Sequence, residues 1–165
     1  MANNDYPLIN QVVPSWADIS VKATPKGGAL IDMKDIASVK RERTVSIGEQ
    51  QGASGGRVMA RTTGSVKYVF SWTLYRSGHS LLLEQLAPLA PKRGIQRRVS
   101  LVHFGVQVQH MPQGSSRPFE WRAKGVRVLG DAADAAEGDD ADKVDVPCST
   151  IEIVDVINGL EVLPL

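Results

Sequence analysis

Alternating apolar and polar positions at residues 66–75 give the clearest structural signal in this sequence. One face is apolar or aromatic and the opposite face is mixed, with Val66, Tyr68, Phe70, Trp72 and Leu74 against Lys67, Val69, Ser71, Thr73 and Tyr75. Successive side chains of a β-strand point to opposite sides of the sheet. The pattern therefore predicts a strand with one buried face.

Further stretches alternate in the same way and are predicted strands separated by turns rich in Gly and Pro. They cover residues 16–24, 30–47, 95–110, 119–128 and 144–157. Alternation changes phase at Gly125, which predicts a β-bulge. In the last of these stretches both faces become apolar, which predicts burial on both sides near its end. Asn158-Gly159 predicts a tight turn into a short apolar tail at residues 160–165.

One short helix is predicted at residues 80–87, which are amphipathic. A turn at Ser77-Gly78 precedes them, and Pro88 ends the helix because the residue before a proline avoids the helical conformation. The 165 residues form a single, mostly β domain. Residues 1–15 carry scattered apolar side chains and two prolines, which predicts an extended arm lying on its own domain or on a neighbour.

Residues 48–64 form a Gly-rich, basic stretch that we interpret as a 17-residue loop with no structure of its own. Such a loop is unusual in a compact domain unless it is functional or packs on a partner. Its glycine spacing matches neither the P-loop nor the dinucleotide fingerprint, so nucleotide binding is not expected. We predict that it contacts other subunits through Gly48, Gly52, Gly55, Gly56, Arg57, Met59, Arg61 and Gly64.

The predicted strand at residues 30–47 has an apolar face that turns basic halfway, at Arg41 and Arg43. A strand with such a face is expected to leave its own domain there and to pair elsewhere. Arg41 and Arg43 are therefore candidate edge-strand contacts. The alternative interpretation is an ordinary solvent-exposed strand end.

The net charge of +1 hides a separation of charge along the chain. Residues 40–127 carry fifteen Lys or Arg against four Asp or Glu, whereas residues 131–165 carry one Lys and ten acids. Such asymmetry often marks complementary surfaces, although two differently solvated ends of one domain would also explain it. The acidic, alanine-rich stretch at residues 131–143 is predicted to be a loop, and it lacks the spacing of a calcium-binding loop.

Several functional classes find no support in the sequence. No apolar run approaches the roughly 18–20 residues that span a bilayer, and no secretory signal is visible. The single Cys148 forbids an internal disulfide and fits a small core residue. No nucleophile–base set and no metal-ligand spacing among the histidines is found, so we expect neither an enzyme nor a cofactor.

The order of these parts resembles the major tail tube proteins of long-tailed bacteriophages and, more distantly, the tube protein of type VI secretion. The resemblance is carried by RTTG at 61–64, SVKYVFSWTLYR at 65–76, SLLLEQLA at 80–87, WADISVK at 16–22 and VPCSTIEIVDVING at 146–159. It covers most of the chain. The acidic stretch at residues 131–143 has no place in the family pattern.

The resemblance implies two packed antiparallel sheets, as a sandwich or partly open barrel, flanked by one helix. It implies hexameric rings stacked into a tail tube, assembled in the host bacterial cytoplasm and carried in the virion. Double-stranded DNA would pass through without being read. Tape-measure and tail-completion proteins would be further partners, and membrane insertion is not expected.

Two electrostatic expectations follow from such an assembly. The basic loop of one ring is expected to meet acids of the next, with Asp131, Asp134, Asp139 and Asp140 as candidates. A wall that lets DNA slide is expected to carry acids rather than cations, with Glu152 and Asp155 as candidates.

A second hypothesis is a small β-barrel that binds nucleic acid. Its cations would lie between Lys40 and Arg127, and Tyr68, Trp72 and Trp121 would be stacking platforms. Their places in the alternation make these aromatic side chains look buried, which argues against this hypothesis.

Overall fold

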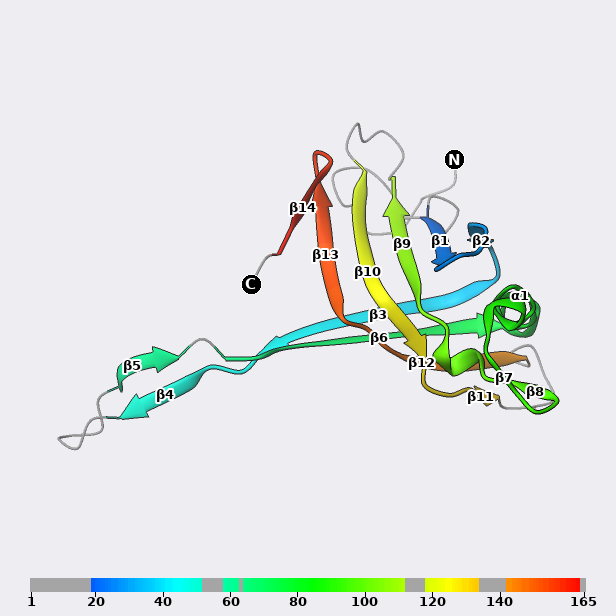
Figure 1. Ribbon diagram of the computed structural model, residues 1–165. Coiled ribbons are helices and arrows are strands. Elements are labelled where there is room, and N and C mark those ends of the chain that lie inside the picture. Colours follow the sequence, from blue (N-terminus) through cyan, green and yellow to red (C-terminus); the bar gives the residue numbers. More distant parts are fainter. Residues whose placement is uncertain (1–18, 52–57, 63, 112–117, 134–141, 164–165) are drawn as a thin grey trace, which may run out of the picture.

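The computed structural model of the chain describes residues 19–51, 58–62, 64–111, 118–133 and 142–163. Figure 1 shows two layers of strands that cross one another, with a helix at one end and an arm of paired strands at the other. No helix within the described ranges is both long and apolar enough to cross a membrane.

The first layer is an antiparallel sheet in the order β2-β1-β9-β10-β13-β14. Its strands are β1 (Ile19–Pro25), β2 (Ile31–Met33), β9 (Phe104–His110), β10 (Phe119–Val128), β13 (Glu152–Ile157) and β14 (Leu160–Val162). The order requires strands that are distant in sequence to lie side by side.

The second layer is built around β6 (Val66–Tyr75), which lies between β3 (Ile36–Val45) and β12 (Lys143–Ser149). A two-residue strand, β11 (Ala132–Ala133), pairs with β12. Strand β10 joins the layers, because its last two residues leave the first sheet and pair with β12. The layers are thus continuous along one side and open on the other.

The core fills the space between the crossed layers. Phe70 of β6 and Trp121 of β10 meet edge to face, with ring centroids 6.0 Å apart, and Trp72 stacks on Phe104 at 6.1 Å. Both pairs connect one layer with the other, and Phe70 and Trp72 are fully buried. Burial of large aromatic side chains is a dominant contribution to stability in a domain of this size.

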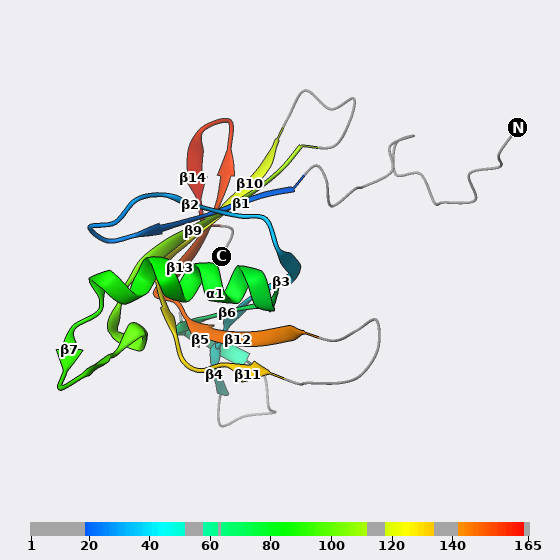
Figure 2. The same ribbon diagram turned by 90° about the vertical axis from the view of Figure 1, so that its right-hand side faces the viewer.

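Helix α1 (Arg76–Leu86) covers the space between the layers at one end and contacts β2, β6 and β12 (Figure 2). Its Leu82 and Leu86 are fully buried. Gly78 lies against the connection between β2 and β3. A Cβ at Gly78 would be only 2.6 Å from the carbonyl oxygen of Asp35 in that connection. The helix packs tightly because this position has no side chain.

The structure confirms the predicted fold class and most of the predicted strand faces. Alternate residues of β6, β9 and β10 are buried as the pattern required. The bulge is present, because the β9–β10 register shifts between Ala123 and Val126, and Gly125 has a φ of 63°. The predicted turn connects β13 to β14, with positive φ angles at Asn158 and Gly159, as a tight hairpin requires.

Three predicted strands are shorter than expected, because a change of partner interrupts each one. The stretch at residues 30–47 divides into β2 and β3, and 144–157 divides into β12 and β13, which belong to different layers. Within 95–110 only β9 belongs to the first layer, since the earlier part forms the small hairpin of β7 (Lys92–Arg93) and β8 (Gln96–Arg97) and the turn Val99–Leu101.

Three other segments differ from the predictions. The helix begins at Arg76 rather than at residue 80, so Ser77 and Gly78 form its first turn instead of a turn before it. The apolar tail at residues 160–165 contains a strand, β14, and the acidic stretch at 131–143 contains β11 and the first residue of β12. The predicted arm at residues 1–15 lies outside the described residues.

We predict that Gly78→Ala destabilises the domain by about 1–3 kcal/mol, the usual cost of overpacking a tight contact. The added methyl group would press on backbone atoms of Asp35, which cannot move as a side chain can. Equilibrium denaturant unfolding measures the change. Gly130→Ala is the matched control, since nothing lies within 4 Å of the position that its methyl group would take. Equal stability of both variants would contradict this explanation of the packing.

Candidate assembly surface

An arm extends from the body of the protein on the strands β3 and β6 (Figure 1). Their pairing continues to Val45 and Val66, whereas β12 accompanies β6 only as far as Val69. Beyond this point β4 (Gly48–Gln51) and β5 (Val58–Thr62) pair as a second two-stranded segment. The prediction of a structureless loop at residues 48–64 was therefore wrong: much of this stretch is a hairpin that extends away from its own domain.

Within the arm, a narrow neck at Ser46 and Ser65 joins the pair β4–β5 to the ends of β3 and β6. The Ser46 amide donates a hydrogen bond to the Ser65 carbonyl at 3.1 Å. A Cβ built on Gly64 would lie only 1.1 Å from the carbonyl oxygen of Ser46. Only glycine permits this approach of the two backbones. Gly64 thus has a role within the chain, beside the contact with other subunits that the sequence suggested.

Strand β3 forms a free edge in the described part of the chain, because its only partner there is β6. Strands β2 and β14 are the corresponding edges of the first layer. Each edge presents backbone N–H and C=O groups that can pair with another strand. The outward side chains of β3 are Ser38, Lys40, Glu42 and Thr44, which are exposed.

Arg41 and Arg43 lie on the half-buried face of β3, at the point where the arm leaves the body. Both bind the carboxylate of Asp155 on β13: Arg43 Nη2 lies 2.7 Å from Oδ2, and Arg41 Nη1 binds Oδ1. The Arg41 guanidinium also lies over two rings, 5.0 Å from the centroid of Trp121 and 5.5 Å from that of Phe119. The basic interruption of the apolar face therefore connects the two layers of one chain.

The Asp155 carboxylate is stabilised in its charged form. Partial burial acts to raise its pKa, but the hydrogen bonds and positive charges of Arg41 and Arg43 outweigh burial and hold the pKa below its usual value. The side chain of Asp155 is 15% exposed, and that of Arg43 is 13% exposed. An ion pair this far from solvent is sensitive to the loss of either partner.

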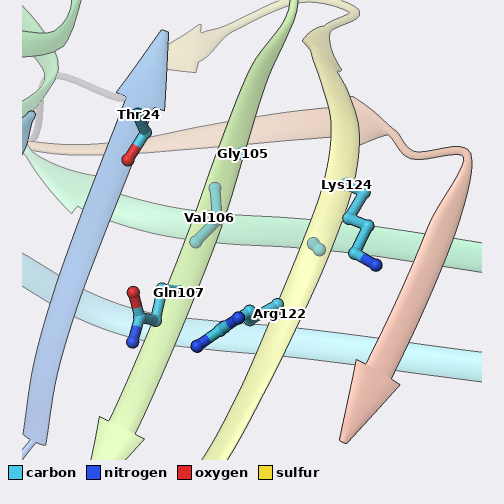
Figure 3. A pocket seen from close by; sticks show the side chains of 7 residues that line it. Thr24, Gly105, Val106, Gln107, Arg122 and Lys124 are labelled. Carbon is cyan, nitrogen blue, oxygen red and sulfur yellow. The ribbon is translucent and has the colours of Figure 1, made fainter. Parts of the chain in front are cut away.

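A hollow of about 320 Å³ lies on the outer face of the first layer, over β1, β9 and β10 (Figure 3). Gln107, Arg122 and Lys124 surround it, and Gly105 leaves its floor without a side chain. Both cations are already paired: Arg122 Nη2 lies 2.7 Å from Glu120, Lys124 Nζ lies 3.5 Å from Glu152, and Glu161 binds both. This pairing makes the hollow a poor site for a further anion.

The other residues predicted from the sequence are spread over the molecule. Met59 and Arg61 lie on β5, whereas Asp131 directly precedes β11, and its carboxylate is 3.8 Å from His79 Nε2. The remaining predicted residues of the loop and of the acidic stretch lie outside the described residues: Gly52, Gly55, Gly56, Arg57, Asp134, Asp139 and Asp140. Within the described ranges, no group of three His, Cys, Asp or Glu side chains is placed to hold a metal ion.

Sequence reasoning missed the pairing of the arginines with Asp155. Asp155 lies more than a hundred positions from both arginines and on the other layer, so no local pattern connects them. The one sequence signal for this pairing was the alternation of apolar and polar positions along residues 144–157. Asp155 shares its face of the sheet with Trp121, to which it is directly paired across β10 and β13.

Comparison with solved structures shows the same fold in chains of three assemblies. A chain of the anti-feeding prophage baseplate superposes with a TM-score of 0.58 at 12% identity, over 86% of this chain and 94% of that one. A chain of the sheath/tube terminator of the PVC extracellular contractile injection system gives 0.63 at 8%, over 93% and 99%. A chain of the anti-feeding prophage tube-terminating cap gives 0.61 at 9%, over 94% and 98%.

No family model matches the sequence, and no curated protein matches it significantly. At identities this low the structural likeness establishes the fold alone. It confirms, at the level of the fold, the resemblance to tail tube proteins that the sequence indicated.

We predict that Asp155→Asn lowers the stability of the domain by about 2 kcal/mol at pH 7, because two half-buried guanidinium groups lose their anion. The pKa of Asp155 is lowered on folding, so its contribution is present above the unfolded pKa of about 3.9 and is lost as the pH falls through the lower folded value. The difference between the wild type and the variant should therefore shrink in strong acid. Denaturant unfolding at several pH values measures it.

The matched control for that experiment is Asp145→Asn, an exposed carboxylate on β12 that accepts a hydrogen bond from Thr73. This change should alter stability by no more than about 0.5 kcal/mol, as is usual at exposed sites. A constant difference between the wild type and Asp155→Asn from pH 7 into strong acid would show that charge pairing is not the cause.

We also predict that Gly64→Ala opens the neck of the arm and leaves the body folded. The methyl group cannot occupy a position 1.1 Å from a carbonyl oxygen, so the Ser46–Ser65 pairing must separate. Hydrogen exchange of the Ser46 amide should become faster, while the buried amides of β9 and β10 keep their protection. Gly105→Ala serves as the control, because its methyl group would meet only Ala123 at 3.8 Å. Unchanged exchange at Ser46 would refute the role given to Gly64.

Proposed function

We propose that this chain is the structural subunit of a tail tube of the kind found in long-tailed phages. Six copies form a ring, rings stack into a tube, and double-stranded DNA passes through the channel during ejection. The observation that carries this proposal is the hairpin arm, which extends from the domain on two strands that are longer than the core requires. The fold shared with chains of contractile injection assemblies supports it.

Ring formation accounts for the free edges of the two layers. An open sheet with an unpaired edge tends to pair with another chain, and closure of a ring leaves no free edge. In the described residues β3 offers such an edge along ten residues. A head-to-tail contact that closes by rotation and repeats along an axis produces a tube.

Stacking of rings accounts for the arm and the separation of charge. In Figure 1 the arm and β11 lie at opposite ends of the molecule. Arg61 lies on β5 and Arg57 directly precedes β5 in the sequence, whereas Asp131, the first residue of the acidic stretch, directly precedes β11. An arm that reaches the next ring would bring these arginines toward Asp131, Asp134, Asp139 and Asp140, where bidentate carboxylate contacts are favourable.

The structure separates the two acids proposed for the channel wall. Glu152 lies on the outer face of the first layer with Glu120 and Glu161, three acids against the two cations Arg122 and Lys124, so it can contribute to a surface that repels phosphate. The carboxylate of Asp155 is held by two arginines of its own chain and adds little negative field beyond them. We therefore retain Glu152 for this role and assign Asp155 to the connection between the layers.

Nucleic-acid binding by a monomer finds less support than assembly. Two of its three proposed stacking platforms are in the core, since Trp72 is 1% and Trp121 is 6% exposed. Buried rings cannot stack on bases. Passage of DNA through a tube requires no such platforms.

We predict that the double charge reversal Arg57→Glu and Arg61→Glu blocks tube formation but leaves a folded subunit. Negative-stain imaging and light scattering measure the assembly, and circular dichroism measures the fold. Lys26→Glu with Lys92→Glu is the matched control, because both lysines are exposed and lie outside the arm. Normal tubes from the arm variant would refute the proposed inter-ring contact. A wild-type chain that stays monomeric and retards nucleic acid in a gel would favour the alternative function.

A further inference from the structure

The small hairpin of β7 and β8 extends away from the two layers, beside the helix (Figure 2). Its strands are joined by Gly94 and Ile95 alone, and Gly94 has a φ of 64°, a conformation that suits glycine at the first position of such a turn. Turn positions are usually polar, but here the side chain of Ile95 is fully exposed. The hairpin therefore presents an aliphatic side chain at its tip.

Arg97 holds this hairpin in place. Its Nη1 donates hydrogen bonds to the carbonyl oxygens of Ala87 and Pro88, at 3.2 and 3.1 Å, in the turn that directly follows the helix. The amide of Arg98 donates to the carbonyl of Pro91 at 3.3 Å. A cation is favourable at the end of a helix because the last carbonyls there lack partners. The tip is thus fixed before any partner binds, which lowers the entropic cost of binding.

The hairpin belongs to a part of the chain that carries positive charge only. Residues 85–119 contain five Lys or Arg and no Asp or Glu. Neighbouring segments add two further cations, because the amide of Lys26 donates to the carbonyl of His103 at 3.0 Å and Arg127 Nε donates to the carbonyl of Ser100 at 2.9 Å. We call the surface that these cations form the cationic end; its residues are Lys26, Lys92, Arg97, Arg98 and Arg127.

The charge of the cationic end is not compensated within the described part of the chain. None of its five cations pairs with a carboxylate there, whereas Arg122 and Lys124 on the outer face of the first layer are both neutralised by glutamates. A cluster of unpaired cations raises the local potential and favours the approach of an anionic partner. The partner of this surface is therefore expected to be acidic.

The side chains of the cationic end favour a protein over a nucleic acid. Bases stack on aromatic rings, but the only Phe, Tyr or Trp in residues 85–111 is Phe104, which is 2% exposed. The exposed apolar side chains are aliphatic instead, namely Ile95 and Leu101. An aliphatic tip surrounded by cations matches an apolar pocket with an acidic rim, the usual anatomy of a protein interface.

Another copy of the chain is a weaker candidate for this partner. In the proposed tube the acids of residues 131–140 face the arginines of the arm, and in Figure 1 the arm and the β7–β8 hairpin lie at opposite ends of the molecule. We propose that the cationic end is a docking surface for a different, acidic protein, which receives the Ile95 side chain in an apolar pocket. The choice of a different protein rests on the proposed tube, whereas the docking surface itself does not.

Binding of two synthetic peptides to the full chain tests this proposal by fluorescence anisotropy. One labelled peptide consists of glutamate and leucine, and in the other alanine replaces every leucine. We expect the wild type to bind the leucine peptide more tightly, and both affinities to fall as salt rises, because salt screens exposed charges. Ile95→Ser should weaken binding of the leucine peptide about tenfold, since an isoleucine side chain is no longer buried, and leave binding of the alanine peptide unchanged.

A pair of charge variants tests whether the location of the cations matters. Lys92→Glu with Arg98→Glu should abolish binding of both peptides. Lys40→Glu with Lys67→Glu is the matched control, because it changes the net charge equally at two exposed lysines on β3 and β6, outside the cationic end, and should keep the binding. Equal loss in both pairs would reduce the effect to net charge and overturn the proposal, as would an Ile95→Ser chain that binds both peptides like the wild type.

Two further measurements identify the class of partner. Tighter binding of duplex DNA than of the leucine peptide, lost in the Lys92→Glu, Arg98→Glu chain, would make this surface a nucleic-acid site and overturn the proposal. Self-association that Ile95→Ser abolishes, measured by light scattering, would identify another copy as the partner and overturn it too. Normal tubes from Ile95→Ser are expected. Because the peptide assay needs only folded subunits, a wild type that binds the peptides but forms no tubes would refute the proposed function alone.

Discussion

Strands β3 and β6 are longer than the core that they help to build, and much of the remaining structure is a consequence of this. Each has ten residues, but β12 accompanies β6 along only seven of them. Past that point the second layer consists of two strands, which are marginally stable alone. The chain supports them at the junction with Arg41, Arg43 and Asp155, which tie β3 to β13 of the other layer. The arm is therefore anchored at its base, and beyond that base β4 and β5 form a separate two-stranded sheet.

That arrangement leaves the core independent of the arm. In the described part of the chain no polar or charged residue is fully buried, and the core consists of apolar and aromatic side chains from both layers and the helix. The polar pairs lie at the junction and on the outer face, where Glu120, Glu152 and Glu161 neutralise Arg122 and Lys124. Hydrophobic burial can thus stabilise the domain without the arm.

The sequence predicted what depends on local periodicity and failed where tertiary partners decide. Phe70, Trp72 and Leu74 were placed correctly because a half-buried strand shows its faces directly, and the bulge at Gly125 was readable as a change of phase. The break between β12 and β13 could not be predicted, because Thr150 and Ile151 suit a strand. Only the change from one layer to the other interrupts the strand there. Likewise Arg41 was recognised as anomalous on its strand, but its partner lies 114 residues away. The arm was taken for a loop because glycines conceal its strand pairing.

In the proposed assembly, the same contrast bears on how contacts between subunits would be specified. An edge strand alone offers only backbone groups, which any extended chain can match, so edge pairing gives affinity with little selectivity. Selectivity requires side chains at fixed positions. The structure provides them beside the edge: the Arg41 guanidinium holds the rings of Phe119 and Trp121, and those rings form one wall of an apolar groove next to β3. Because the Asp155 pair orients Arg41, the interaction that anchors the arm also shapes the groove.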